Sequence, residues 1–125
     1  MALHTDLSIH KSCCDLLRVT MEATKEMRRD FKSSIGTEVR ALCVSMLLSV
    51  MRANKTVNPA QKITHIDQVL EDVEVFNDLF RVCRDVHVIT TKIYARATEI
   101  TGSIGRQAGG WRKSASSPVA SPSRR

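Results

Sequence analysis

The stretch that decides the fold is Ile100-Thr101-Gly102-Ser103-Ile104-Gly105-Arg106-Gln107-Ala108-Gly109-Gly110-Trp111. Gly102, Gly105 and Gly109 recur at steps of three and four, the spacing that places residues on one face of a helix. Because each helical residue turns by about 100°, the apolar residues gather on the opposite face. These are Ile100, Ile104, Ala108 and Trp111. We expect a helix that feeds a core with one side and presents bare backbone on the other.

The glycine face predicts that another molecule comes very close to this helix. Each glycine in a helix interior costs up to about 1 kcal/mol relative to alanine, so a row of three needs a reason. The close approach of a large partner to the bare backbone supplies one. The alternative is a fraying helix end, with Gly109-Gly110 as a stop signal. That alternative leaves Gly102 and Gly105 unexplained, since both lie inside the apolar periodicity.

Two more helices are expected before this one in the first half of the chain. The first helix is expected over residues 6–29, and the break between the two helices is expected at residues 31–33. Ser34 is expected to cap the second helix, which ends near Asn54. The apolar seam predicted for the first helix alternates steps of three and four. It consists of Leu7, His10, Cys14, Leu17, Met21 and Thr24. The second helix has a wide apolar face of Ile35, Val39, Leu42, Cys43, Met46, Leu47 and Val50.

A third helix begins at Asn58-Pro59, because a capping Asn, Pro at the first helical position and Gln61 form a start signal. It ends near His87, and Thr90 or Thr91 caps the last helix. Four long amphipathic helices with short loops predict an all-α protein, an up-down-up-down four-helix bundle. We assign the bundle to residues 1–113. Residues 114–125 are rich in Ser, Pro and Arg, so we expect a disordered tail.

Composition narrows the class of protein. Aromatic residues make up only 4% of the chain, against 42% hydrophobic residues overall, which favours a helical core of aliphatic side chains. The beginning of the chain does not resemble a signal peptide. The longest apolar stretch, residues 41–51, is too short to span a bilayer. We therefore expect a cytoplasmic protein that has no contact with a membrane.

No motif for catalysis is found, so the chain is not expected to be an enzyme or to need a cofactor. The four cysteines form no C-x-x-C pair and are interpreted as small buried hydrophobic residues. His10 and Cys14 have a spacing that can hold a metal, but no second pair completes a zinc site, and none is predicted. Asp67, Glu71, Glu74 and Asp78 form an acidic row on one face of the third helix. We expect this row to be solvated or to pair with basic residues of a neighbouring subunit.

Positive charge is concentrated toward both ends of the predicted bundle. The formal net charge is +6, and residues 100–125 contain five basic and no acidic residues. Chain direction in an up-down bundle brings one basic group to the end where the first and third helices finish. It consists of Arg28, Arg29, Lys32, Arg81 and Arg84, with Arg40 and Arg96 one or two turns away. A second group at the opposite end consists of Arg106, Arg112 and Lys113, with Arg124 and Arg125 in the tail.

These two groups are our candidate sites for a polyanionic partner. Tyr94 and Trp111 offer little capacity for base stacking, so contacts to nucleic acid would be mainly to phosphate and would weaken with salt. The alternative, which stays open, is that these cations only offset helix dipoles and keep the surface soluble.

Several segments resemble the accessory variability proteins of diversity-generating retroelements. The most specific match is the closing signature: Tyr94, Glu99-Ile100, residues 103–111 and Lys113-Ser114. Weaker matches are Phe31-Lys32 through Ile35-Gly36, Glu38-Val39-Arg40, Leu47-Leu48 through Arg52-Ala53-Asn54-Lys55, Phe80-Arg81 and Arg84-Asp85. Together they cover about residues 6–114. One departure is Asn77-Asp78, where the family pattern implies more basic character.

This resemblance implies a four-helix bundle that assembles as a basic, homopentameric ring. In such a ring Gly102, Gly105 and Gly109 are expected to form the subunit interface, because close packing between subunits favours small residues; the alternative is that nucleic-acid phosphates use this face. It implies two partners, the retroelement's reverse transcriptase and its template-repeat RNA, in support of error-prone cDNA synthesis. A sister group, encoded in intervening sequences of ribosomal RNA genes, shares the bundle and the ring and is the first alternative. The second alternative is a structural helical oligomer or adaptor without nucleic-acid binding, whose partner binding would not depend on salt.

Overall fold

The computed structural model describes residues 3–117, which are all-helical and contain no strand. The elements are η1 (His4–Asp6), α1 (Ser8–Lys25), α2 (Arg29–Phe31), η2 (Lys32–Gly36), α3 (Thr37–Lys55), α4 (Pro59–Asp85) and α5 (Thr91–Ser116). The short α2, the π-helical η2 and α3 form one continuous helix, Arg29–Lys55, so four long helices make up the fold. The all-α prediction is confirmed for this part of the chain.

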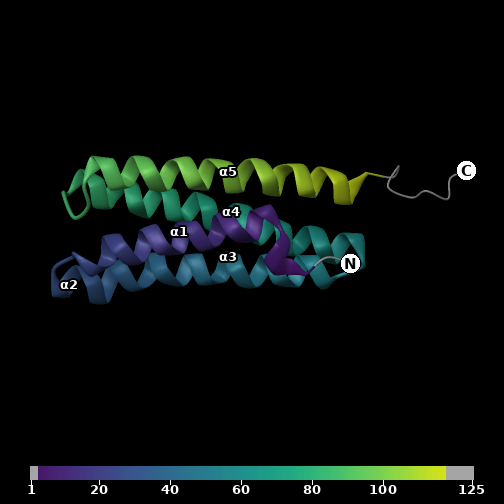
Figure 1. Cartoon of the computed structure of the whole chain (residues 1–125), viewed down its shortest axis with the longest axis horizontal. Coiled ribbons are helices and arrows are strands. Elements are labelled where there is room, and N and C mark those ends of the chain that lie inside the picture. Colours follow the sequence, from purple (N-terminus) through teal and green to yellow (C-terminus); the bar gives the residue numbers. More distant parts are fainter. Residues whose placement is uncertain (1–2, 118–125) are drawn as a thin grey trace, which may run out of the picture.

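The four long helices pack as an up-down-up-down bundle (Figure 1). Contacts join α1 to α3, α3 to α4, α4 to α5 and α5 back to α1. Both the α1–α2 turn and the α4–α5 turn lie at one end of the bundle, on the left of Figure 1. α5 continues to Ser116, so residues 114–116 of the expected tail are helical. Residues 118–125, the rest of that tail, lie outside the described residues, as do residues 1–2.

Two predicted helix starts are confirmed by their capping hydrogen bonds. The backbone N–H of Gln61 donates to Asn58 Oδ1 at 3.0 Å, and Pro59 stands at the beginning of α4. The N–H of Ile93 donates to Thr90 Oγ1 at 3.1 Å at the start of α5. Each side chain satisfies a backbone donor that the first helical turn leaves without a partner.

The boundary between the first and second helices was predicted wrongly. α1 ends at Lys25, and the next helix already begins at Arg29, so residues 31–33 start a helix instead of ending one. The chain turns at residues 26–28, where Arg28 has an extended backbone and Met27 is buried in the core. Ser34 is not a cap, since its hydroxyl donates to the carbonyl of Asp30 at 2.6 Å inside the helix. Neither Gly nor Pro marks this turn, and the sequence therefore carries no break signal there.

The seam predicted for α1 was also wrong by about a quarter of a turn. The residues that α1 buries are Ile9, Cys13, Leu16, Val19, Thr20, Ala23 and Thr24, whereas Met21 is 55% exposed. Doublets such as Cys13-Cys14 make two neighbouring rows that both obey steps of three and four, so spacing alone does not choose between them. Thr20 joins the buried row because its hydroxyl donates to the carbonyl of Leu16 at 2.7 Å.

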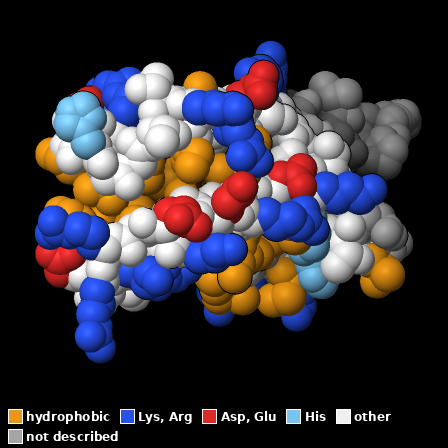
Figure 2. Space-filling model, turned by 60° about the vertical axis from the view of Figure 1, so that its left-hand side comes forward, with side chains coloured by type: hydrophobic (Ala, Val, Ile, Leu, Met, Phe, Trp, Pro, Cys, Tyr) orange, Lys and Arg blue, Asp and Glu red, His pale blue; other side chains and the backbone are white. Residues whose placement is uncertain are grey.

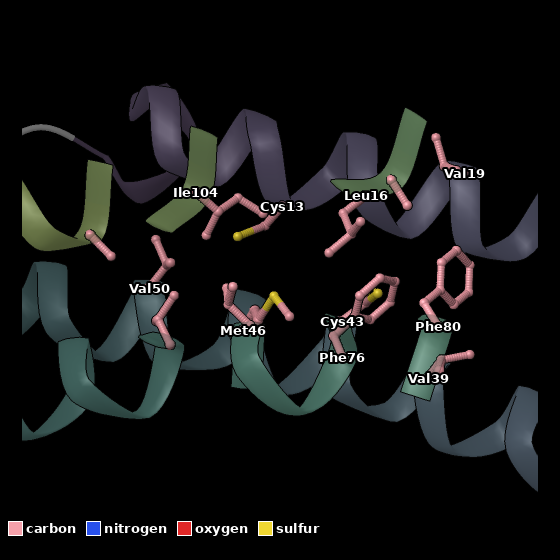
Figure 3. Packing of buried hydrophobic residues seen from close by; sticks show 14 of the residues in the cluster. Cys13, Leu16, Val19, Val39, Cys43, Met46, Val50, Phe76, Phe80 and Ile104 are labelled. Atoms are coloured by element: carbon pink, nitrogen blue, oxygen red, sulfur yellow. The ribbon is translucent and has the colours of Figure 1, made fainter. Parts of the chain in front are cut away.

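Side chains from all four helices meet in one core (Figure 3). Phe76 and Phe80 of α4 stack with ring centroids 4.7 Å apart, beside Cys43 of α3 and Leu16 of α1. α5 contributes Ala97, Ile104 and Ala108, which are fully buried. Ile104 and Ala108 belong to the predicted apolar face, whose other members, Ile100 and Trp111, are partly buried against the core. The apolar side of α5 is thus used within the subunit, which leaves its glycine side on the outside.

The continuous helix Arg29–Lys55 is long and apolar enough, by length and composition alone, to cross a membrane. An 18-residue window of it has a mean hydropathy of 1.4, and 33% of that window is buried. The sequence analysis judged only the apolar stretch 41–51 as too short to span a bilayer, but that stretch lies within a helix of 27 residues. Core helices of soluble proteins pass the same test, and Val39, Cys43 and Val50 of this helix are fully buried in the bundle.

Candidate functional site

The first basic group is assembled where α1 and α4 end and α2 and α5 begin. Arg28 forms an ion pair with Asp30 at 2.9 Å, and its guanidinium lies over the ring of Phe31 at 5.0 Å from the centroid. A hydrogen bond to Asp30 raises the pKa of Arg28, and the same bond lowers the pKa of the Asp30 carboxyl. Arg28 is therefore held in place by its own segment, with its charge largely offset.

Tyr94 connects the two cations at the end of α4. The guanidinium of Arg84 stacks on the Tyr94 ring at 4.4 Å from the centroid and pairs with Asp85 at 2.9 Å. A hydrogen bond to Tyr94 raises the pKa of Arg81. The Tyr94 side chain thus positions two adjacent positive charges at the junction of α4 and α5. Sequence reasoning took Tyr94 only as part of a family signature and missed this arrangement.

The other predicted members of this group differ in whether their charges are paired with acidic residues of the chain. Arg29 and Lys32 are exposed, and neither pairs with an acidic residue within the part of the chain that the structure describes. Arg40 donates to the hydroxyl of Thr37 at 3.3 Å. Arg96 reaches across to α1 and contacts Glu22 at 3.3 Å, so it stabilises the α1–α5 contact. Among the described residues, the members of this group that form no ion pair are Arg29, Lys32, Arg40 and Arg81, and nearby Asp78 and Asp85 partly offset the charge of Arg81.

Next to these cations lies an open groove that the sequence analysis did not foresee. It has a cavity volume of about 510 Å³ and a predominantly apolar lining. The lining comes from the start of the second long helix and the end of α4: Phe31, Ser33, Ser34, Ile35, Thr37, Glu38, Val82, Cys83, Val86 and Val88. The missed signal is a second apolar row on α4, Val75, Leu79, Val82 and Val86, at steps of four, three and four. Figure 2 brings this end forward and shows hydrophobic side chains at the surface among charged ones.

The second basic group is less compact than predicted. Arg112 pairs with Asp67 of α4 at 2.6 Å, and the hydrogen bond to Asp67 raises the pKa of Arg112. Arg106 and Lys113 are seven residues apart, so they share the outward face of α5 about two turns from each other. Both are exposed and without an acidic partner among residues 3–117. Arg124 and Arg125 lie outside the described residues.

The glycine face of α5 is open in the subunit. A Cβ added at Gly105 or at Gly109 would meet nothing within 4 Å, and one at Gly102 would only approach Arg106 at 3.5 Å. No element of this chain within residues 3–117 therefore requires glycine at Gly105 or Gly109. The face is open for close packing with another molecule, and its role as a subunit interface stays a prediction.

Three polar residues of α4, Asp67, Asp72 and Asn77, form contacts within the chain. Asp67 of the predicted acidic row pairs with Arg112 of the same subunit. Asp72, which that row did not include, is buried and accepts hydrogen bonds from Ser45 at 2.5 Å and Gln68 at 3.0 Å. Asn77, where the family pattern implies basic character, accepts a hydrogen bond from Thr101 at 2.8 Å. It is thus a contact between α4 and α5.

The cysteines have the environment of core residues. Burial raises the pKa of Cys13 to about 12 and that of Cys43 to about 11, so both thiols are protonated at neutral pH. Cys14 Sγ lies 3.8 Å from Nδ1 of His10, the pair with metal-ligand spacing. Within residues 3–117 no group of three or more His, Cys, Asp or Glu side chains gathers in a way that could hold a metal ion.

Comparison with known proteins connects these features to a family. A family model described as bAvd-like matches residues 7–115, which include all four long helices. This chain belongs to the bAvd-like family. No curated protein and no solved structure matches the chain. The bAvd-like match confirms the resemblance to accessory variability proteins, and it covers the glycine face and the described parts of both basic groups.

Proposed function

We propose that this chain is a non-catalytic accessory protein of a diversity-generating retroelement. In this proposal it assembles as a homopentameric ring and binds the reverse transcriptase and the template-repeat RNA through its basic surfaces, to support error-prone cDNA synthesis. The site of action is the cytoplasm of a bacterial or phage-infected cell, and no membrane is involved. Membership of the bAvd-like family is the observation that carries the proposal.

The charge distribution supports binding to a polyanion. Arg29, Lys32 and Arg81 lie exposed at one end of the bundle, and Arg106 and Lys113 lie exposed on α5. Five copies of the chain would carry a formal charge near +30, five times +6. Cations that form no ion pair within the chain can neutralise phosphates at little cost, because no existing ion pair must be broken.

A ring gives the open glycine face a role. A cyclic assembly uses head-to-tail contacts, in which one patch of each subunit meets a different patch of the next. The bare backbone at Gly105 and Gly109 allows a helix of the neighbouring subunit to approach more closely than side chains would. The glycine positions of α5 then contribute to assembly, and the basic group where α1 and α4 end stays available for partners.

The proposal is tested by the double variant Arg81→Ala/Arg84→Ala. It should bind the template RNA or the reverse transcriptase more weakly while the bundle stays folded, because Arg81 is exposed and Arg84 is about one-third exposed. Binding of purified RNA and purified polymerase is measured at about 50 mM and about 200 mM salt, where phosphate contacts should weaken by orders of magnitude. The control variant Arg18→Ala/Arg52→Ala removes the same charge elsewhere and should bind like wild type. Unchanged affinity for both partners in Arg81→Ala/Arg84→Ala would remove this patch from the proposal, and binding that is independent of salt would favour an adaptor.

A further inference from the structure

We propose that the apolar groove beside the first basic group is a docking site for a protein, and that it receives an apolar segment flanked by acidic residues. The inference deepens the proposed function, on which it rests: under that function the protein is the reverse transcriptase. It assigns the groove itself, which is lined by α2, η2 and the end of α4, to the polymerase and not to RNA.

The apolar surface of the groove is too exposed for a subunit that works alone. Val82 and Val86 are 51% and 57% exposed, although both stand beside residues that pack into the core. Phe31, Ile35 and Val88 extend this surface as partly buried side chains. Apolar side chains that cluster at a concave surface mark binding sites more often than isolated exposed ones do.

The polar residues in the groove are already satisfied by the backbone. The hydroxyls of Ser33 and Ser34 donate to the carbonyl of Asp30 at 3.4 and 2.6 Å, and that of Thr37 donates to the carbonyl of Ser33 at 3.3 Å. The wide turn of η2 makes these contacts available, since its π-helical register brings carbonyls within reach of side chains four and five residues on. The donors are therefore turned away from a ligand, and the groove offers mainly apolar contact.

RNA gains little from such a surface. Proteins hold RNA through cations and donors at phosphate and sugar, and by stacking bases on aromatic rings. Phe31 is the one aromatic residue in the lining, and the Arg28 guanidinium already occupies one face of its ring. Val82 and Val86 provide neither a charge nor a ring. An apolar side chain from a protein partner is the occupant that these residues fit.

The charge around the groove defines the partner further. Arg29, Lys32 and Arg81 lie at this end and form no ion pair among the described residues, although Asp78 and Asp85 are near enough to Arg81 to help raise its pKa. Glu38 is the only carboxylate in the lining. The surroundings are thus positive around an apolar centre. A segment with apolar residues between carboxylates would match both, and the charges would guide its approach.

The test uses the double variant Val82→Gln/Val86→Gln, which removes apolar surface without changing charge or the capacity to form a helix. Its affinity for the purified reverse transcriptase should fall by about tenfold or more, while its affinity for the template RNA stays at the wild-type value. Val57→Gln, at an 81% exposed valine between α3 and α4, is the control and should bind both partners normally. Circular dichroism and native mass confirm that each variant folds and assembles like wild type.

Each other outcome overturns the inference in a distinct way. Loss of RNA affinity in Val82→Gln/Val86→Gln would assign the groove to RNA, and a change in native mass would assign it to a second copy of the chain. Polymerase affinity equal to that of wild type would show that no partner uses the groove, with the proposed function intact. Wild-type protein that binds neither RNA nor polymerase would overturn the proposed function and the inference together.

Discussion

The buried thiols of Cys13 and Cys43 make the free energy of unfolding depend on pH. Burial opposes the thiolate, so the pKa of each is raised in the folded protein, to about 12 and about 11, from 9.0 in the unfolded chain. Above pH 9 the unfolded chain releases these protons while the folded protein keeps them. The free energy of unfolding should therefore be unaffected below pH 9 and should fall as pH rises from 9 toward 11.

We expect urea unfolding at pH 8 and pH 10.5 to show this loss, by up to about 1.4 kcal/mol per pH unit for each thiol. The variant Cys13→Ala/Cys43→Ala, less stable overall because it loses core volume, should show a smaller pH dependence than wild type. Equal slopes for wild type and variant would show that other groups cause the effect.

His87 is a residue whose backbone conformation suits glycine better than histidine. It has a φ of 62°, in the left-handed region, at the turn between α4 and α5. The N–H groups of His87 and Val88 donate to the carbonyls of Arg84 and Cys83 at 3.0 and 2.7 Å, the pattern of a Schellman motif. His87→Gly should raise the free energy of unfolding by about 1 kcal/mol, because a side chain is disfavoured at this φ. Thermal unfolding measures the change, His87→Ala serves as the matched variant without this gain, and a lower melting temperature for His87→Gly would contradict the explanation.

At the scale of elements, α5 has one face for the core and one for another molecule. Gly105→Leu should leave the bundle folded, since a Cβ at Gly105 meets nothing within 4 Å, but should prevent close packing between subunits. In high salt and after nuclease treatment, wild type should have a native mass of about 70 kDa, five times the 14.0 kDa of one chain, and the variant a lower one. Gly105→Ala is the control: it should assemble and favour the helix by about 1 kcal/mol. A Gly105→Leu variant with the wild-type mass would show that the glycine face is not an interface.

Elements with strong local signals could be predicted from the sequence, and elements without them could not. Asn58-Pro59 and Thr90 mark helix starts chemically, and both caps form as expected. The turn at residues 26–28 contains no Gly or Pro, and it depends on burial of Met27, a tertiary effect that periodicity does not encode. In the same way, two overlapping rows on α1 left its core face undecided, because helix packing selects the row.

The sequence was enough to predict which cations gather at one end of the bundle. It was not enough to predict the contacts that their side chains make there. Chain direction alone brings Arg28 and Arg84 to one end of the bundle. The stacking of Arg84 on Tyr94, and the groove beside Val82 and Val86, depend on how neighbouring helices are rotated about their axes. That rotation follows from packing in the core, so it became visible only in the structure.

At the scale of the whole molecule, three kinds of exposed surface lie outside the core: a glycine face, an apolar groove and groups of cations. The bundle buries one continuous core, yet leaves open a glycine face on α5, an apolar groove at one end and, at both basic groups, cations that form no ion pair among the described residues. Each of these is expected of a chain that works inside a larger complex, as the proposed function requires. Under the proposed function the three surfaces serve three partners: a second subunit, the polymerase and the RNA.

The most direct measurement is cDNA synthesis in a reaction reconstituted from the retroelement's reverse transcriptase and template RNA, with and without this protein. We expect cDNA from the template repeat to accumulate only weakly without the protein and strongly with it. Addition of Arg81→Ala/Arg84→Ala should give less product than wild type, and addition of Arg18→Ala/Arg52→Ala should give as much. A cDNA yield that is the same with and without the wild-type protein would contradict the proposed accessory function.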